Sequence, residues 1–144
     1  LETAKEPEFK AAFSLYEKAA QAGHAQAQNN LGYLYQSGQG TKADLEEAAR
    51  WYEHAANQGN LDGMFNFGLM TLKGQGGLLP DKVKAFVLWG RAAMKLHPAA
   101  TKHLAALANS LTAAEITQGR AEAQAWTASP SKRVLQYFVI RKGD

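Results

Sequence analysis

The sequence has no cysteine and no run of apolar residues long enough to cross a lipid bilayer. The absence of cysteine excludes disulfide bonds and thiolate metal sites, but it does not decide between an oxidising and a reducing compartment. Lys, Glu, Gln or His interrupts every apolar stretch well short of the roughly 20 residues that a membrane-spanning helix needs. We therefore expect a chain that does not insert into a membrane.

Excess basic charge is missing from most of the chain. Sixteen Lys and Arg residues against 13 Asp and Glu residues give a net charge of +3, and residues 130–144 account for all of that excess. Nucleic-acid-binding proteins usually gather Lys and Arg along one face or on one recognition helix. The charge pattern therefore argues against nucleic acid as a partner.

The familiar motifs of catalysis are missing as well. The two Gly-Gln-Gly segments, Gly38–Gly40 and Gly74–Gly76, lack the third glycine or the Gly-Lys-Ser/Thr of phosphate-binding loops. No two histidines have the spacing of a helical zinc site, and no serine lies in a Gly-x-Ser-x-Gly turn. We expect no enzymatic activity, no cofactor and no metal.

The sequence does contain an internal repeat. Residues from Glu8 to Gly40 align without a gap on residues from Asp44 to Gly76, an offset of 36 residues that pairs Gly32 with Gly68. A third, degenerate copy begins at Asp81 and lacks the later glycines. The repeats span approximately residues 8–43, 44–80 and 81–110.

Each repeat is predicted to form two helices. In the first segment, alanines and one large aromatic residue such as Tyr16 or Tyr52 recur at helical spacing, a combination that favours close helix crossing. Gly32 and Gly68 lie inside the second helices, where glycine costs about 1 kcal/mol relative to alanine. Their recurrence therefore indicates close packing against another helix.

The repeat resembles a known family. The order A-x-A-Q-x-x-L-G-x-L-Y-x-x-G-x-G from Ala25 to Gly40, followed by D-x-x-x-A-x-x-W-Y-x-x-A-A-x-x-G from Asp44 to Gly59, is similar to the Sel-one-like repeat (SLR), a relative of the tetratricopeptide repeat. The resemblance implies an all-α, right-handed α/α superhelix. The second helix of each repeat, which contains the Leu-Gly of the motif, would lie on its concave side, and the first helix, which contains the Ala-Ala, on its convex side.

A closing helix is predicted after the repeats. Thr112 and Glu115 have the spacing of a capping box, which starts a helix over residues 112–127. Such a helix resembles the C-terminal cap that shields the last unit of a repeat array. We therefore expect about seven helices in a repeat domain of residues 1–129, followed by an extended tail of residues 130–144.

The concave face is the predicted binding surface. Phe65, Leu69 and Leu72 form an apolar strip there, which either faces a ligand or packs locally. The candidate protein-binding residues of this face are Gln26, Asn29, Tyr33, Gln36, Asp62, Phe65, Leu69, Leu72, Lys73, Lys102 and Asn109.

The tail is the second predicted contact surface. Its apolar segment is flanked by Lys132-Arg133 and Arg141-Lys142, and it is expected either to pack on its own solenoid or to dock on another chain, with a homodimer as one result. The predicted contact residues are Val134, Leu135, Tyr137, Phe138, Val139 and Ile140.

These patterns favour a scaffold or adaptor that binds a partner protein or peptide on the concave face of the repeats. The alternative is an accessory or regulatory subunit of a bacterial envelope assembly that uses its tail as the contact. The family resemblance implies a periplasmic or secreted location, with the cytoplasm as the alternative. The first residue is Leu1 rather than Met, so we also expect that a segment once preceded it.

Overall fold

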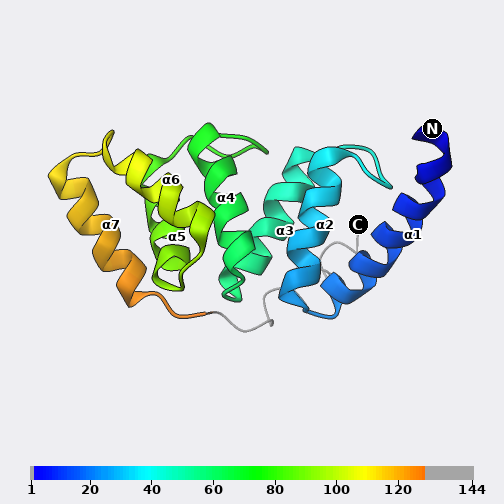
Figure 1. Cartoon of the computed structure of the whole chain (residues 1–144), viewed down its shortest axis with the longest axis horizontal. Coiled ribbons are helices and arrows are strands. Elements are labelled where there is room, and N and C mark those ends of the chain that lie inside the picture. Colours follow the sequence, from blue (N-terminus) through cyan, green and yellow to red (C-terminus); the bar gives the residue numbers. More distant parts are fainter. Residues whose placement is uncertain (1, 129–144) are drawn as a thin grey trace.

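The computed structural model describes residues 2–128, which form seven α-helices (Figure 1). The all-α architecture of seven helices in consecutive pairs confirms the predicted fold class. The predicted tail, with all six of its contact residues, lies outside the described residues. The helices are α1 (Glu2–Gln21), α2 (Ala25–Ser37), α3 (Leu45–Asn57), α4 (Leu61–Lys73), α5 (Lys82–Met94), α6 (Pro98–Ala108) and α7 (Ala113–Ala125).

The helices begin and end where the sequence provides caps. Asp44 and Asp81 each accept a hydrogen bond from a backbone N–H in the first turn of α3 and α5, at 3.1 and 3.0 Å. Gly38 and Gly74 end α2 and α4 in the left-handed conformation, which glycine adopts without steric cost. The predicted capping box of Thr112 is present at the start of α7.

The glycines inside α2 and α4 each hold an aromatic ring from the following helix. A Cβ atom on Gly32 would lie 2.7 Å from Tyr52 Cδ1, and one on Gly68 would lie 2.8 Å from Trp89 Cδ1. Both rings are almost completely buried. The prediction that these glycines serve close helix packing is therefore confirmed, and each glycine with its ring locks one helix pair together.

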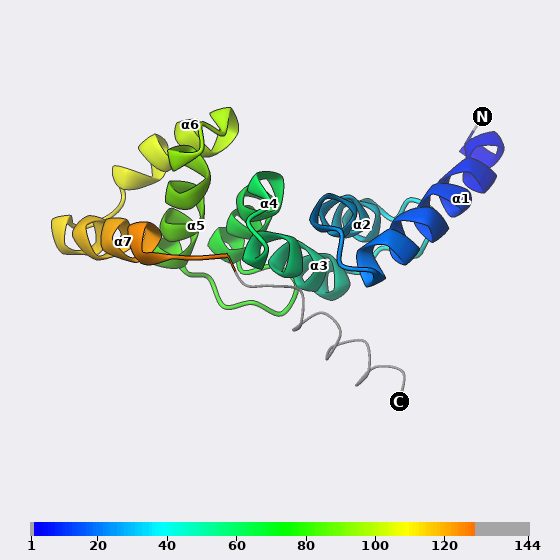
Figure 2. The ribbon, with the colours of Figure 1, turned by 90° about the horizontal axis from the view of Figure 1, so that it is seen from below.

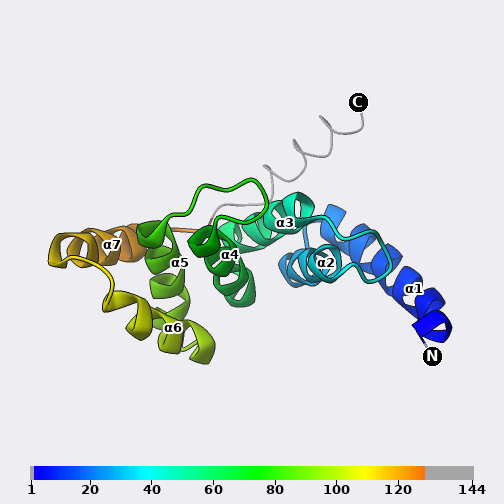
Figure 3. The same ribbon diagram turned by 90° about the horizontal axis from the view of Figure 1, so that it is seen from above.

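The helices form a curved array with two sides. Figure 2 shows α2, α4 and α6 along the inner, concave side and α3, α5 and α7 along the outer side, and Figure 3 shows the same order from the opposite direction. Within residues 2–128, no helix combines the length and apolarity required to span a bilayer.

The closing helix differs from the helices that precede it. Whereas α3 packs on α2 and α5 packs on α4, α7 packs mainly on α5 and not on α6, its neighbour in sequence. Only residues 109–112 connect α6 to α7, compared with residues 38–44 and 74–81 in the regular pairs. The helix expected to shield the last unit therefore leaves one side of α6 open.

Candidate protein-binding face

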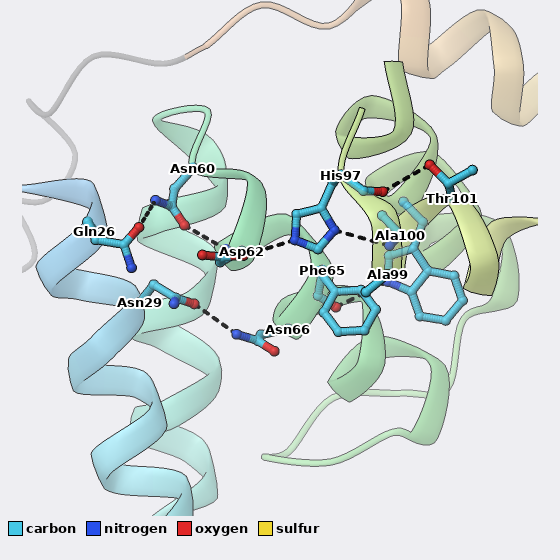
Figure 4. Close-up of polar contacts among 12 residues, drawn as sticks. Gln26, Asn29, Asn60, Asp62, Phe65, Asn66, His97, Ala99, Ala100 and Thr101 are labelled. Atoms are coloured by element: carbon cyan, nitrogen blue, oxygen red, sulfur yellow. Dashed lines mark hydrogen bonds and ion pairs between the residues drawn. The ribbon is translucent and has the colours of Figure 1, made fainter. Parts of the chain in front are cut away.

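Amide side chains bridge successive helices on the inner side of the array. Asn66 Nδ2 on α4 donates a hydrogen bond to Asn29 Oδ1 on α2 at 2.9 Å, and Asn60 Nδ2 donates to Gln26 Oε1 at 3.1 Å (Figure 4). Asn60 also caps α4, since its Oδ1 accepts from the backbone N–H of Gly63 at 2.7 Å. These amide pairs fix the register of α2 against α4 on the face where the binding residues were predicted.

Four rings gather next to the amide pairs, where α4, α5 and α6 meet. Phe65 lies at the centre, with ring centroids 4.9 Å from His103, 5.4 Å from His97 and 6.2 Å from Trp89. Trp89 is buried and donates its indole N–H to the Phe65 carbonyl oxygen at 3.1 Å. We call Phe65, Trp89, His97 and His103 the four-ring cluster.

Hydrogen bonds orient both imidazoles of the four-ring cluster. The backbone N–H of Ala100 donates to His97 Nδ1 at 3.1 Å, so in the neutral ring the proton lies on Nε2, which donates to Asp62 Oδ1 at 2.9 Å (Figure 4). His103 Nδ1 donates to the carbonyl oxygen of Ala99 at 2.8 Å. In the neutral His103 ring, Nε2 is therefore the hydrogen-bond acceptor.

The sequence prediction did not include the two histidines. His97 is the N-cap of α6, the place that Asn60 has in α4, and the repeat offset could have indicated this role. The sequence carried no signal for the position of His103 beside Phe65, since that contact joins residues on different helices.

The predicted inner-face residues lie on α2, α4 and α6 or at the C-cap of α6, and they differ in exposure. Asn29 is buried, and its side chain belongs to an amide pair. Gln36 accepts a hydrogen bond from the Tyr52 hydroxyl at 2.7 Å, and burial raises the pKa of Tyr52, which keeps that donor protonated. The exposed members are Gln26, Tyr33, Gln36, Asp62, Lys73, Lys102 and Asn109.

The apolar strip of Phe65, Leu69 and Leu72 is half-buried. All three side chains pack against the main core, so the structure shows the local packing that the sequence left open beside a ligand-facing role. Leu78 joins the same core, whereas Leu79 is exposed. Part of each strip residue remains exposed at the surface.

The comparisons with known proteins identify the family. The family model named Sel1 repeat matches residues 5–24, 25–60 and 61–95, which is more than half of the chain. The chain belongs to the Sel1 repeat family. The two full matches cover α2 with α3 and α4 with α5, so α6 and α7 lie outside the matched residues.

Two solved structures show the same fold. One is described as c5321, a protective antigen present in uropathogenic Escherichia coli strains that displays an SLR fold; it is 27% identical, with a TM-score of 0.81 over 94% of this chain and 29% of its own. The other, a Sel1 repeat protein from Oxalobacter formigenes, is 32% identical, with a TM-score of 0.60 over 62% of this chain and 66% of its own. This chain therefore spans less than two thirds of either protein. No curated protein sequence matches it significantly.

Membership of the family sets the class of function. Sel1 repeat proteins are usually non-catalytic scaffolds, and a repeat domain of this kind implies protein binding. Among residues 2–128, no three His, Asp or Glu side chains lie close enough together to hold a metal ion.

Proposed function

We propose that the protein is an interaction scaffold that binds an extended segment of a partner protein along its inner face. The observation that carries the proposal is the row of paired amides, Gln26 with Asn60 and Asn29 with Asn66, which runs directly into the four-ring cluster. Repeat arrays commonly use such an extended concave surface for binding.

The chemistry of this row suits a peptide backbone. Each amide side chain has two donor hydrogens, and Gln26, Asn60 and Asn66 each use one of them within the protein, which leaves a second donor hydrogen on each for a ligand. Asn29 is buried, so its part is to hold Asn66 in position. The half-buried rings of Phe65 and His103 next to the row offer apolar surface for one side chain of the partner. A peptide fits both features if its backbone N–H and C=O groups lie along the amide row and it carries one large apolar side chain.

Exposed residues at the two ends of the face supply the test. Tyr33 is 53% exposed on α2, and Lys102 is exposed on α6, so replacing both with alanine removes little packing. Peptides would be selected against the full-length chain, and their dissociation constants measured by calorimetry. The Tyr33→Ala, Lys102→Ala variant should bind about tenfold more weakly or worse, because interface tyrosines often contribute a large share of the binding energy.

The matched control replaces Glu53 and Lys82, which are exposed on the outer helices α3 and α5. It should bind the selected peptides as the unchanged chain does. Wild-type affinity in the inner-face variant, or a loss confined to the outer-face variant, would rule out the inner face as the binding surface.

The rival function, an envelope-assembly subunit that uses its tail, calls for a separate comparison. A chain that ends at Ser129 should keep its affinity for the selected peptides if the inner face binds them. A loss on truncation alone would favour the tail as the contact.

We also propose a periplasmic or secreted location, as the likeness to an Escherichia coli protective antigen favours. Fractionation of the source cells tests this proposal, and recovery with the cytoplasmic fraction would contradict it.

A further inference from the structure

Within residues 2–128, no helix covers the side of α6 that is equivalent to the side of α4 covered by α5. The N-caps Asn60 and His97 align the two helices, so that the buried residues Met64, Phe67, Gly68 and Thr71 of α4 correspond to four residues of α6. On α4 this side carries α5 with the ring of Trp89. The corresponding α6 residues are Thr101, Leu104, Ala105 and Ala108, and none of them is fully buried.

The sequence of α7 explains why this side stays open. When the N-cap Thr112 is aligned with Asp81 of α5, the position of Trp89 is occupied in α7 by the exposed residue Arg120. The preceding position is Gly119, where an added Cβ atom would lie 2.5 Å from Phe86 Cδ1 on α5. The closing helix therefore has no ring to insert into α6, but it has a glycine that fits it closely to α5.

The result is a groove that has α5 as its floor and α6 and α7 as its walls. It has a volume of about 490 Å³, and its lining is mainly apolar. Met94, on the floor, is 52% exposed. Figures 2 and 3 show α6 and α7 leaving α5 in different directions. The open α6 residues Thr101, Leu104, Ala105 and Ala108 all belong to its lining.

We infer that the chain's own C-terminal segment 134–140 fills this groove, with the ring of Tyr137 or Phe138 packed on the open side of α6, over the methyl group of Ala105 that stands where α4 has Gly68. Tyr137 and Phe138 are the only aromatic residues after Trp126, and the Trp126 ring is already in use under the guanidinium of Arg91, 4.9 Å away. Burial of large apolar side chains is favourable, which gives the segment a reason to dock.

The chain also leaves α7 at the correct place. Trp126 and Ala128 line a second cavity that shares Met94, Ala123 and Gln124 with the groove, so the last described residues lie beside its end. An extended chain spans about 3.3–3.6 Å per residue, and the link from Ala128 to Val134 therefore reaches up to about 20 Å. Pro130 within this link favours a turn.

Cysteine cross-linking in the chain of residues 1–144 tests the inference directly, because these residues include no cysteine that could interfere. One variant carries Ala105→Cys in the groove and Val139→Cys in the segment, which keeps both aromatic residues. The control pairs Val139→Cys with Ala121→Cys, an exposed position on α7 that does not line the groove and is nearer in sequence. The groove pair should form its disulfide within one chain at least roughly ten times faster than the control pair, because docking raises the effective concentration.

Replacing Tyr137 and Phe138 with serine in the groove-pair variant should slow its cross-linking to the control rate. Equal rates for the groove and control pairs would overturn the inference. Disulfides formed mainly between two chains, at a rate that falls on dilution, would also overturn it, since the occupant would then be a second copy.

Discussion

The pairs α4–α5 and α6–α7 follow one another in the chain, yet their second helices pack on different partners. In the first pair, Gly68 on α4 receives the ring of Trp89, and a loop of residues 74–81 returns α5 along α4. In the second pair the glycine lies on the other helix, since Gly119 on α7 receives the ring of Phe86 from α5. The positions of one glycine and one aromatic ring therefore determine that α5 packs on α4, whereas α7 packs on α5.

The largest expected effect comes from removing the ring of a regular pair. Trp89→Ala should lower the free energy of unfolding by about 3–5 kcal/mol, because it leaves a cavity beside Gly68 and removes the hydrogen bond to the Phe65 carbonyl. Denaturant titration measures this loss. Trp126→Ala, a half-buried tryptophan near the end of α7, should cost clearly less, and an equal cost would contradict the special role of the repeat ring.

A smaller effect is expected when the glycine is filled. Gly68→Leu should destabilise the protein by about 1–3 kcal/mol despite the better helix propensity of leucine, because its side chain overlaps the indole of Trp89. The same measurement on Ala121→Leu, an exposed position of α7 outside the groove, gives the comparison. That change should stay within about 0.5 kcal/mol, since within residues 2–128 the side chain at position 121 packs against no other helix. A raised melting temperature for Gly68→Leu would show that the repeat alignment is wrong.

The third unit has a strained residue that the first two units avoid. Leu96 has φ of 65° and is 85% exposed, whereas the equivalent positions in the earlier units are Gly23 and Gly59 with positive φ. Leu96→Gly should stabilise the protein by about 1 kcal/mol, because a left-handed conformation costs other residues roughly 1–2 kcal/mol. Gly59→Ala is the reverse change and should lower the thermal midpoint. If Leu96→Gly also lowers it, the side chain of Leu96 makes a stabilising contact.

The smallest expected effect distinguishes two glycines of the C-terminal end. Among residues 2–128, a Cβ atom at Gly90 would meet only Ala123 Cβ, at 3.4 Å, so Gly90→Ala should stabilise α5 by about 0.5–1 kcal/mol through helix propensity. Gly119→Ala should instead destabilise the protein, because the new methyl group overlaps the ring of Phe86. Differential scanning calorimetry of the two variants should give shifts of opposite sign. Shifts of the same sign would indicate that α7 does not depend on close contact with α5.

Local features of the fold could be predicted well from the sequence. Thr112 with Glu115 acts within one turn of the chain and is found in its predicted role. The glycines that end α2 and α4 act over a similarly short stretch of backbone. Gly32 and Gly68 were predictable as packing sites because both repeats have a glycine inside the second helix, where glycine is otherwise unfavourable.

The contacts of the candidate binding face were less predictable. The face was located by the repeat pattern, but the pairing of Asn29 with Asn66 and of Asp62 with His97 joins residues on different helices. Such pairs depend on the rotation and spacing of two helices, which no local pattern specifies. The half-burial of Phe65 has the same origin, because rings from α5 and α6 converge on it.

The sequence by itself determined the repeated helix pairs, their caps and the glycine with its aromatic partner, because these depend on backbone conformation and on residues at a fixed offset. Only the tertiary structure decided that the four-ring cluster forms and that α7 packs on α5, leaving a groove beside α6. The physical reason is that close packing depends on how well the surfaces of two helices fit each other, which neither helix specifies alone. Gly119 allows α7 to pack closely on Phe86 of α5, and Arg120 lines the groove beside α6; both roles depend on where α5 and α6 lie relative to α7.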